Sequence, residues 1–226
     1  MAVVSRRCHG DGVSPRFWGF LTSEPLAAMD VLDVGTGRGR LALALGPHCR
    51  RVVGIDLDAA AIEEARRRAA GLGLTNVEFA VADAERIEFP GIILGRLGAQ
   101  PHMVTAHLYL SDSLMRASSQ VLAPGGLLAI AGFHADQWRE TGRRSRFAYD
   151  ETQVRQALEA CDFDVVHLEV EREVRTFGSV EEALADVLAL EDRWRQDARW
   201  FNYIKYLEDG GRELTRSYLL VKGRRR

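Results

Sequence analysis

Short apolar runs alternate along the chain with longer segments whose apolar positions recur at helical spacing. The runs have the length and continuity of strands buried on both faces of a sheet, and they cover residues 31–34, 51–56, 77–82, 103–109 and 127–133. The segments between them suit helices over residues 41–45, 59–70, 111–121 and 150–160. Strands that alternate with helices in this way predict an α/β fold with a mostly parallel sheet.

The pattern changes after residue 160. Residues 163–174 and 215–221 have the pattern of two further strands, but residues 178–211 separate them. This segment holds an amphipathic stretch followed by a group of aromatic residues, namely Trp194, Trp200, Phe201, Tyr203 and Tyr206. We expect a helical insertion that either encloses a substrate or forms an extra helical layer with an aromatic core.

Two other segments leave a choice open. Residues 1–28 contain Phe17, Trp18 and Phe20, which either form an N-terminal lid over a ligand or pack onto the first helix. The apolar residues 92–94 with Leu97 suit a helix packed on the sheet or part of an interface.

The most informative stretch is the turn that follows the first predicted strand. Asp33 lies near the end of that strand, and Gly35, Gly37 and Gly39 follow at alternate positions before a helix begins. Glycines allow backbone conformations closed to other residues and let a ligand approach the chain. Because a carboxylate repels a phosphate and attracts an ammonium group, Asp33 favours a nucleotide-like ligand that carries an amine.

Acidic residues also end the second and third predicted strands, at Asp56 and Asp83. A carboxylate at the tip of the second strand can accept hydrogen bonds from both hydroxyls of a ribose. The alternative for Asp56 is an N-cap of the next helix, although Asp58 is better placed for that cap. In parallel sheets, the ends of these strands lie along one edge, where ligands bind.

Asp33, Gly35, Gly37 and Gly39 match in full the D/E-x-G-x-G-x-G motif I, so the chain resembles the class I methyltransferases that use S-adenosylmethionine. The chain also resembles this family in an L-x-P-G-G turn before an apolar strand, here Leu122-Ala123-Pro124-Gly125-Gly126. The resemblance implies one domain over residues 1–226, with a seven-stranded, mostly parallel, doubly wound sheet. It also implies an antiparallel last strand and a three-layer αβα sandwich.

The resemblance further implies S-adenosylmethionine as the cofactor and S-adenosylhomocysteine as its product. The family's ribose-binding acid falls on Asp56, and its adenine-binding position falls on Asp83, with the backbone N–H of Ala84 beside it. The cofactor-binding residues expected on this basis are Asp33, Gly35, Thr36, Gly37, Gly39, Asp56, Leu57, Asp83, Ala84 and Thr105.

Candidate catalytic residues follow the fourth and fifth strands. His107 and His134 lie at the exits of adjacent strands, and histidine titrates near neutral pH, so either suits a general base. Tyr109 suits an orienting group. The sequence Thr105-Ala106-His107-Leu108 stands where the family's amide- and base-directed enzymes carry N/D-P-P-F/Y/W, which argues against methylation of DNA or of glutamine side chains.

The composition bears on the methyl acceptor. A formal net charge of −2, with 46% hydrophobic and 27% charged residues, is that of an ordinary soluble protein with no field that recruits nucleic acid. We therefore expect a small-molecule acceptor. An RNA or protein acceptor is suggested only by the basic loop 142–149, which otherwise suits an anionic-substrate clamp or a solvated loop, and by Arg224–Arg226. A non-catalytic nucleotide-binding protein is the third alternative.

The remaining expectations concern metals, location and assembly. Cys8, Cys49 and Cys161 have no metal-ligand spacing, so no metal is expected. No apolar run approaches the about 20 residues that cross a bilayer, and residues 1–12 lack the apolar region of a signal peptide. We expect a cytoplasmic protein without a membrane segment. The sequence leaves open whether it forms a homodimer.

Overall fold

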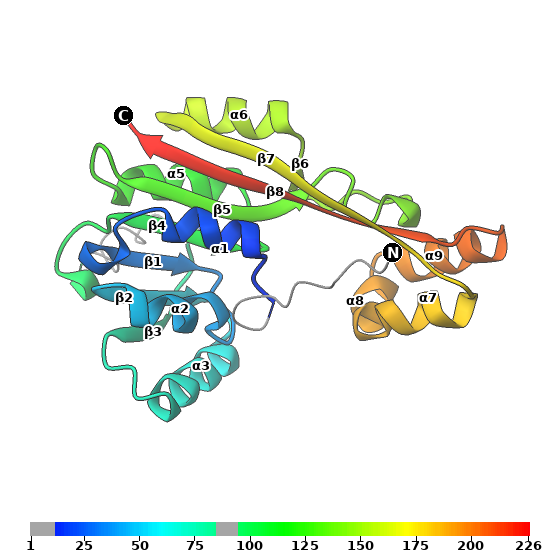
Figure 1. Ribbon diagram of the computed structural model, residues 1–226, viewed down its shortest axis with the longest axis horizontal. Helices are drawn as coiled ribbons and strands as arrows, with labels where there is room; N and C mark the ends of the chain where they lie inside the picture. Colours follow the sequence, from blue (N-terminus) through cyan, green and yellow to red (C-terminus); the bar gives the residue numbers. More distant parts are fainter. Residues whose placement is uncertain (1–11, 85–94) are drawn as a thin grey trace.

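The computed structural model describes residues 12–84 and 95–226, and its central feature is one mixed sheet (Figure 1). The strand order is β3-β2-β1-β4-β5-β8-β7, and a short β6 pairs with β5 off this path. The strands are β1 (Asp30–Val34), β2 (Arg51–Asp56), β3 (Val77–Val81), β4 (Met103–His107), β5 (Leu127–His134), β6 (Ala148–Tyr149), β7 (Phe163–Thr176) and β8 (Glu213–Arg225).

The strand directions confirm the predicted fold class. The pairs that join β1 to β5 are parallel, whereas β8 is antiparallel to both of its neighbours, β5 and β7. The difference from the predicted seven strands is β6, which has only two residues and pairs with the end of β5. A pairing that short leaves no periodic pattern in the sequence.

Helices cover both faces of the sheet. They are α1 (Pro15–Thr22), α2 (Arg40–Leu45), α3 (Ala59–Gly71), α5 (Asp112–Val121), α6 (Glu151–Ala160), α7 (Val180–Val187), α8 (Glu191–Arg195) and α9 (Arg199–Glu208). One apolar cluster joins α1, α2 and α3 to one face, and another joins α5 and α6 to the opposite face. In β1, Val31 belongs to the first cluster and Leu32 to the second, which explains the unbroken apolar runs.

The turn between β1 and α2 requires its glycines for two different reasons. Gly35, Gly37 and Gly39 all have positive φ, at +67°, +53° and +77°. A Cβ on Gly39 would also lie 2.8 Å from the ring of Phe79 and 3.1 Å from the Cβ of Ala65, whereas a Cβ on Gly37 would meet nothing within 4 Å. Gly39 therefore brings α2 close to the sheet and α3, and Gly37 leaves the turn open on its ligand side.

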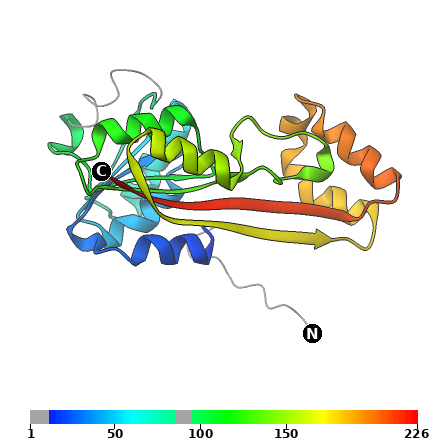
Figure 2. The ribbon, with the colours of Figure 1, turned by 90° about the horizontal axis from the view of Figure 1, so that it is seen from above.

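The strands β7 and β8 are longer than predicted and carry the insertion at their far end (Figures 1 and 2). The insertion is helical, as expected, and comprises α7, α8 and α9. Trp194 and Tyr203 are fully buried, and they belong to a third apolar cluster that also contains Phe133 and Trp138 from the sheet side. These aromatic residues form the core of an extra helical layer.

The described part of the N-terminal segment packs onto the sheet, because Phe17 and Leu21 of α1 are fully buried. Residues 1–11 of this segment, and the predicted apolar residues 92–94, lie outside the described residues. Two of the C-terminal arginines are held in ion pairs. Arg225 ends β8 and pairs with Asp162 at 3.5 Å, and Arg226 pairs with Asp164 at 2.8 Å.

Candidate active site

Three adjoining cavities meet at the carboxyl end of β4, and two of them extend over the carboxyl ends of the neighbouring parallel strands. Cavity A has a volume of about 570 Å³ and is lined at its strand tips by Gly35, Asp56, Leu57, Asp83, Ala84 and Tyr109. Cavity B, of about 430 Å³, lies over the glycine-rich turn and is lined by Asp33, Gly35, Thr36, Gly37, Arg38 and Arg40. Cavity C, of about 640 Å³, lies beside β7 and β8. The predicted edge of the sheet is thus hollowed.

In cavity A, the backbone fixes the orientation of Asp56. Its Oδ2 accepts a hydrogen bond from the N–H of Gly37 at 2.8 Å, and its Oδ1 accepts one from the N–H of Asp58 at 3.0 Å. The N-cap alternative for Asp56 is wrong, because Asp58 itself caps α3 by accepting from the N–H groups of Ala60 and Ala61. Each oxygen of Asp56 retains capacity to accept a further hydrogen bond from a ligand.

In cavity B, Asp33 is a buried carboxylate that is only half satisfied. Asp33 is only 1% exposed, and its Oδ2 accepts a 2.6 Å hydrogen bond from the Thr36 hydroxyl. Its Oδ1 has no partner among the described residues. Burial raises the pKa of Asp33 to about 7, although the hydroxyl of Thr36 and the backbone N–H of Ala42 both lower it. A cationic ligand group would satisfy Oδ1 and stabilise the charged form.

His107 and Leu108 line all three cavities, so this pair marks their junction. Leu108 has a φ of +64°, a conformation that costs a side-chain-bearing residue about 1–3 kcal/mol, and its N–H donates a 2.6 Å hydrogen bond to the carbonyl of Ala131. The strained backbone ends β4 abruptly and leaves the space that the cavities share.

His107 is an uncharged imidazole at neutral pH. Its ring stacks on that of Phe17, with centroids 6.0 Å apart and planes 22° apart. Burial, with a smaller contribution from the positive charge of Arg40, lowers the pKa of His107 to about 4. The structure therefore places His107 at the junction, but with a weaker basicity than an ordinary histidine.

Tyr109 forms a wall of cavity A. Its hydroxyl is hydrogen-bonded to that of Ser111 at 3.1 Å, and its ring lies edge-on to Phe147 at 5.7 Å. The guanidinium of Arg146 lies 4.5 Å from the centre of the Phe147 ring. The basic loop that the sequence singled out thus reaches cavity A through Arg146 and Phe147.

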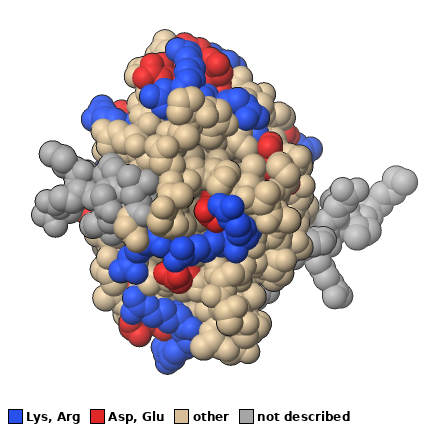
Figure 3. All heavy atoms as spheres, turned by 90° about the vertical axis from the view of Figure 1, so that its left-hand side faces the viewer, with Lys and Arg blue, Asp and Glu red and all other residues tan. Residues whose placement is uncertain are grey.

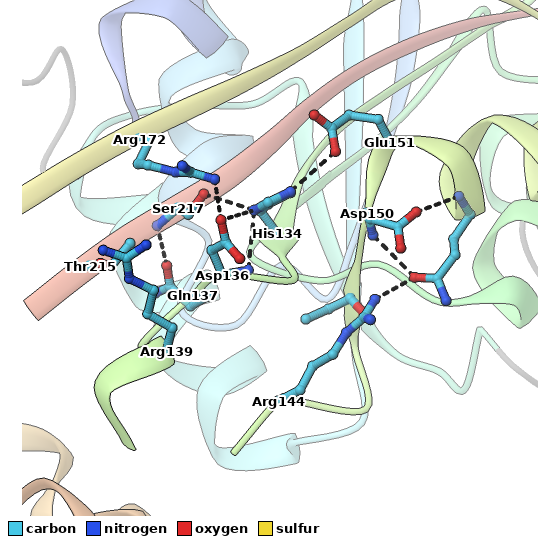
Figure 4. A network of polar contacts seen from close by, with 12 residues as sticks. His134, Asp136, Gln137, Arg139, Arg144, Asp150, Glu151, Arg172, Thr215 and Ser217 are labelled. Carbon is cyan, nitrogen blue, oxygen red and sulfur yellow. Dashed lines mark hydrogen bonds and ion pairs between the residues drawn. The ribbon is translucent and has the colours of Figure 1, made fainter. Parts of the chain in front are cut away.

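The structure does not bring His134 to this site. His134 is 6% exposed and lines none of the three cavities, because it faces the side of β5 opposite to Ala131, which lines cavity C. Its Nδ1 accepts from the N–H of Asp136 at 3.1 Å and lies 3.0 Å from the Ser217 hydroxyl, and its Nε2 lies 3.2 Å from Glu151 (Figure 4). The structure thus places His134 outside these three cavities, and its role as a general base stays a prediction.

Two further predicted residues lie elsewhere than expected. Thr105 is fully buried within β4, and its hydroxyl donates a 2.8 Å hydrogen bond to the carbonyl of Ala129, so it does not line the cavities. Gly39 allows α2 to pack closely against Phe79, and it does not line any of the three cavities. The sequence did not reveal Leu108, Arg40 or Ser111, because a leucine with positive φ and polar residues at helix starts give no distinctive signal.

The helical insertion stays apart from these cavities. None of their lining residues comes from residues 178–211. No group of three or more histidine, cysteine or acidic side chains suited to a metal ion occurs within the described ranges 12–84 and 95–226. Over the same ranges no helix is both long and apolar enough to cross a membrane.

Comparison with known proteins bears on this geometry. A family model described as a methyltransferase domain matches residues 26–163, which contain all four strands whose ends form cavities A and B. The chain belongs to this methyltransferase domain family. Membership confirms the family predicted from motif I, and with it S-adenosylmethionine as the cofactor.

The names of two relatives of this methyltransferase domain give different methyl acceptors. The chain is 48% identical over 63 residues to a tRNA (uracil-5-)-methyltransferase homolog A of Mus musculus, which is 28% of this chain and 10% of that protein. It is 39% identical over 111 residues to a ribosomal protein L11 methyltransferase of Geobacter metallireducens, which is 46% of this chain and 32% of that protein. The chain thus spans a third or less of these relatives.

The fold is shared over nearly the whole chain with a solved structure. The YcgJ protein of Bacillus subtilis superposes with a TM-score of 0.69 at 18% identity, covering 93% of this chain and 98% of that one. The residues of this methyltransferase domain also fit the cofactor: Asp33 Oδ1 is buried with no hydrogen-bond partner in the part of the chain that the structure describes, and Gly37 leaves open space above the turn. The amine of S-adenosylmethionine would pair with Asp33 Oδ1, and another part of the cofactor would occupy the space at Gly37.

Proposed function

We propose that this chain transfers a methyl group from S-adenosylmethionine to a small molecule held in cavity C. The observation that carries the proposal is the junction at His107 and Leu108, where a cavity of about 640 Å³ meets the two cavities that suit the cofactor. Small-molecule sites commonly have volumes of about 300–1,000 Å³. Cavity C therefore has the size for an acceptor and touches the place where the two reactants must meet.

The residues of cavities A and B have distinct roles in this proposal. Asp33 holds the amine of the methionine part, and Asp56 accepts hydrogen bonds from the ribose hydroxyls. Asp83 and the backbone of Ala84 receive the adenine, and Leu57 covers it at the mouth of cavity A. When bound, the cofactor supplies a methyl group on a positively charged sulfur, which is transferred by in-line displacement to the acceptor.

His107 serves as a neutral orienting group beside the transferred methyl. Because its pKa is lowered to about 4, it carries no charge that would repel the positive sulfur. Its ring stacks on that of Phe17, which restricts its rotation at the junction of the cavities. The protein otherwise aligns the two reactants and excludes water, which are the main requirements of this reaction.

Labelled methyl transfer tests this function. The full chain is incubated with methyl-labelled S-adenosylmethionine and, separately, with a small-molecule cell extract, with total RNA and with total protein. We expect a labelled product distinct from S-adenosylmethionine only in the small-molecule fraction. Label confined to RNA or protein would contradict the proposed acceptor class, and label in no fraction would favour the non-catalytic alternative.

A macromolecular acceptor is the second candidate, because the relatives above are named for tRNA and for a ribosomal protein. The formal net charge of −2 favours it less. At the amino ends of the parallel strands, the end of the sheet opposite to the cavities, basic and acidic side chains lie side by side (Figure 3). Several are paired, among them Arg50 with Asp30 and Arg51 with Glu78, both at 2.6 Å. Such pairs leave less free positive charge for a phosphate backbone.

Alanine substitutions at the two histidines separate a role at the junction from a structural one. His107→Ala removes one oriented hydrogen-bonding group, so we expect kcat to fall about tenfold, with the affinity for S-adenosylhomocysteine within threefold of the original. Because His107 is uncharged above pH 5, it contributes no inflection to the kcat profile between pH 6 and 9.

His134→Ala is the matched control. It removes a buried side chain bonded to Ser217 and Asp136, so we expect a loss of about 1–3 kcal/mol in the free energy of unfolding and kcat within threefold. Equal losses of kcat in both variants would remove the distinction drawn between them.

A further inference from the structure

Cavity C is lined on one side by β7 and β8, where the two strands run side by side beyond α1 (Figure 2). Glu171 of β7 and Tyr218 of β8 are directly opposed in the strand pairing, so both side chains stand on the same face of the sheet. Leu220 and Ala131 continue that face toward His107. The cavity thus has an apolar floor with an acidic and aromatic end.

The arginines of cavity C already have carboxylate partners. Arg16 pairs with Glu169, Arg172 with Asp136, and Arg216 with Asp186, the last at 2.9 Å. Each positive charge is therefore matched by a carboxylate that is not itself part of the cavity lining. An anionic ligand would have to compete with these ion pairs.

Glu171 differs from these arginines, because one of its oxygens lacks a partner. Its Oε2 is out of contact with solvent and has no hydrogen-bond partner among the described residues. Glu173, the next side chain on the same face, adds a second negative charge to the lining. A buried acceptor without a donor is costly, and a ligand that brings an N–H group removes the cost.

We propose that the acceptor bound in cavity C is a small molecule that carries a cationic amine as its recognition group, with Glu171 accepting a hydrogen bond from the ammonium nitrogen and the ring of Tyr218 lying against its charge. The ammonium nitrogen has no lone pair, so the methyl group goes to another atom of the acceptor, nearer His107. An ammonium group gains from both contacts, because a carboxylate pairs with it and the face of an aromatic ring attracts it. Burial raises the pKa of Tyr218, so its hydroxyl stays uncharged. This inference rests on the proposed function and names the class of its acceptor.

The test compares three probes of the same shape and different charge. 2-Phenylethylamine, 2-phenylethanol and 3-phenylpropanoate are titrated by calorimetry into the full chain saturated with S-adenosylhomocysteine at pH 7.5. We expect the amine to bind at least tenfold more tightly than the neutral and anionic probes. Equal affinities, or tighter binding of 3-phenylpropanoate, would overturn the inference without any need for a variant.

Two variants then locate the interaction. Glu171→Gln keeps the shape and removes the charge, so we expect about tenfold weaker binding of 2-phenylethylamine. Glu173→Gln removes the same charge from the same strand and should weaken it no more than threefold. Equal effects would show a general electrostatic preference and overturn the role of Glu171.

Binding of S-adenosylhomocysteine to the same samples separates the two proposals. If it binds and the amine preference is absent, only the acceptor class fails. If it does not bind to the original chain, the proposed function fails whatever the amine does. An unchanged affinity for S-adenosylhomocysteine in Glu171→Gln also verifies that the variant is folded.

Discussion

Asp33→Asn is expected to make the ligand-free protein more stable and its cofactor binding weaker. Asp33 is buried, and its pKa is raised from 3.8 to about 7, so the folded state binds this proton more tightly than the unfolded state. The contribution of Asp33 to stability is therefore complete below pH 3.8 and is lost as the pH rises to 7. At pH 8 the ionised carboxylate carries its full cost, roughly 4 kcal/mol for three pKa units.

Asparagine removes that cost, so the variant should gain up to about 4 kcal/mol in the free energy of unfolding at pH 8, and less at pH 5. The affinity for S-adenosylhomocysteine should fall about 100-fold, since a charged hydrogen bond contributes about 1.5–3 kcal/mol. Denaturant unfolding at the two pH values and calorimetry measure the two effects. A variant that binds as tightly as the original would separate Asp33 from the amine.

The same arrangement predicts that ligand binding releases a proton near pH 7. In the ligand-free protein, Asp33 is half protonated at that pH, and an amine at Oδ1 favours its ionised form. The heat of binding should therefore depend on the ionisation enthalpy of the buffer for the original chain and not for Asp33→Asn. Buffer-independent heats in both would contradict the assignment.

Gly39→Ala is expected to cost about 3–5 kcal/mol of stability, much more than Gly37→Ala. Both residues have positive φ, which costs alanine about 1–2 kcal/mol. At Gly39 the added Cβ also lies 2.8 Å from Phe79 and 3.1 Å from Ala65, so α2 must move away from its neighbours. At Gly37 nothing lies within 4 Å.

Denaturant unfolding of both variants without ligand measures the difference. Gly37→Ala should instead lose affinity for S-adenosylhomocysteine, because its new methyl group enters the space above the turn at cavity B. Equal stabilities of the two variants would contradict the separate roles given to these glycines, and unchanged binding by a folded Gly37→Ala would place the ligand elsewhere.

The sequence predicted the parallel half of the fold well because most of its strands are buried on both faces. β1, β2, β4 and β5 are largely apolar runs, whereas the edge strand β3 alternates, with Glu78 and Val81 exposed. The ends of all five strands agree with the predicted ranges to within two residues. The strands β7 and β8 were predicted too short, since the residues missed at their ends include Arg175, Glu213, Arg224 and Arg225. Charged residues at the ends of a strand give no clear strand pattern.

The site was predictable where the chemistry is local in sequence. Asp33, Asp56 and Asp83 each follow from a strand and its end, and the structure brings all three to adjoining cavities. The position of His134 was not predictable, because one residue of register decides which face of β5 it occupies. Cavity C was also invisible in the sequence, since Arg16 and Tyr218 come from opposite ends of the chain.

Acidic strand tips and an open glycine turn select an amine-bearing adenosyl ligand over a diphosphate. Calorimetry of the full chain with S-adenosylhomocysteine and, separately, with NAD measures this selection. We expect one-to-one binding of S-adenosylhomocysteine and no heat of binding with NAD. Binding of NAD without any response to S-adenosylhomocysteine would contradict it.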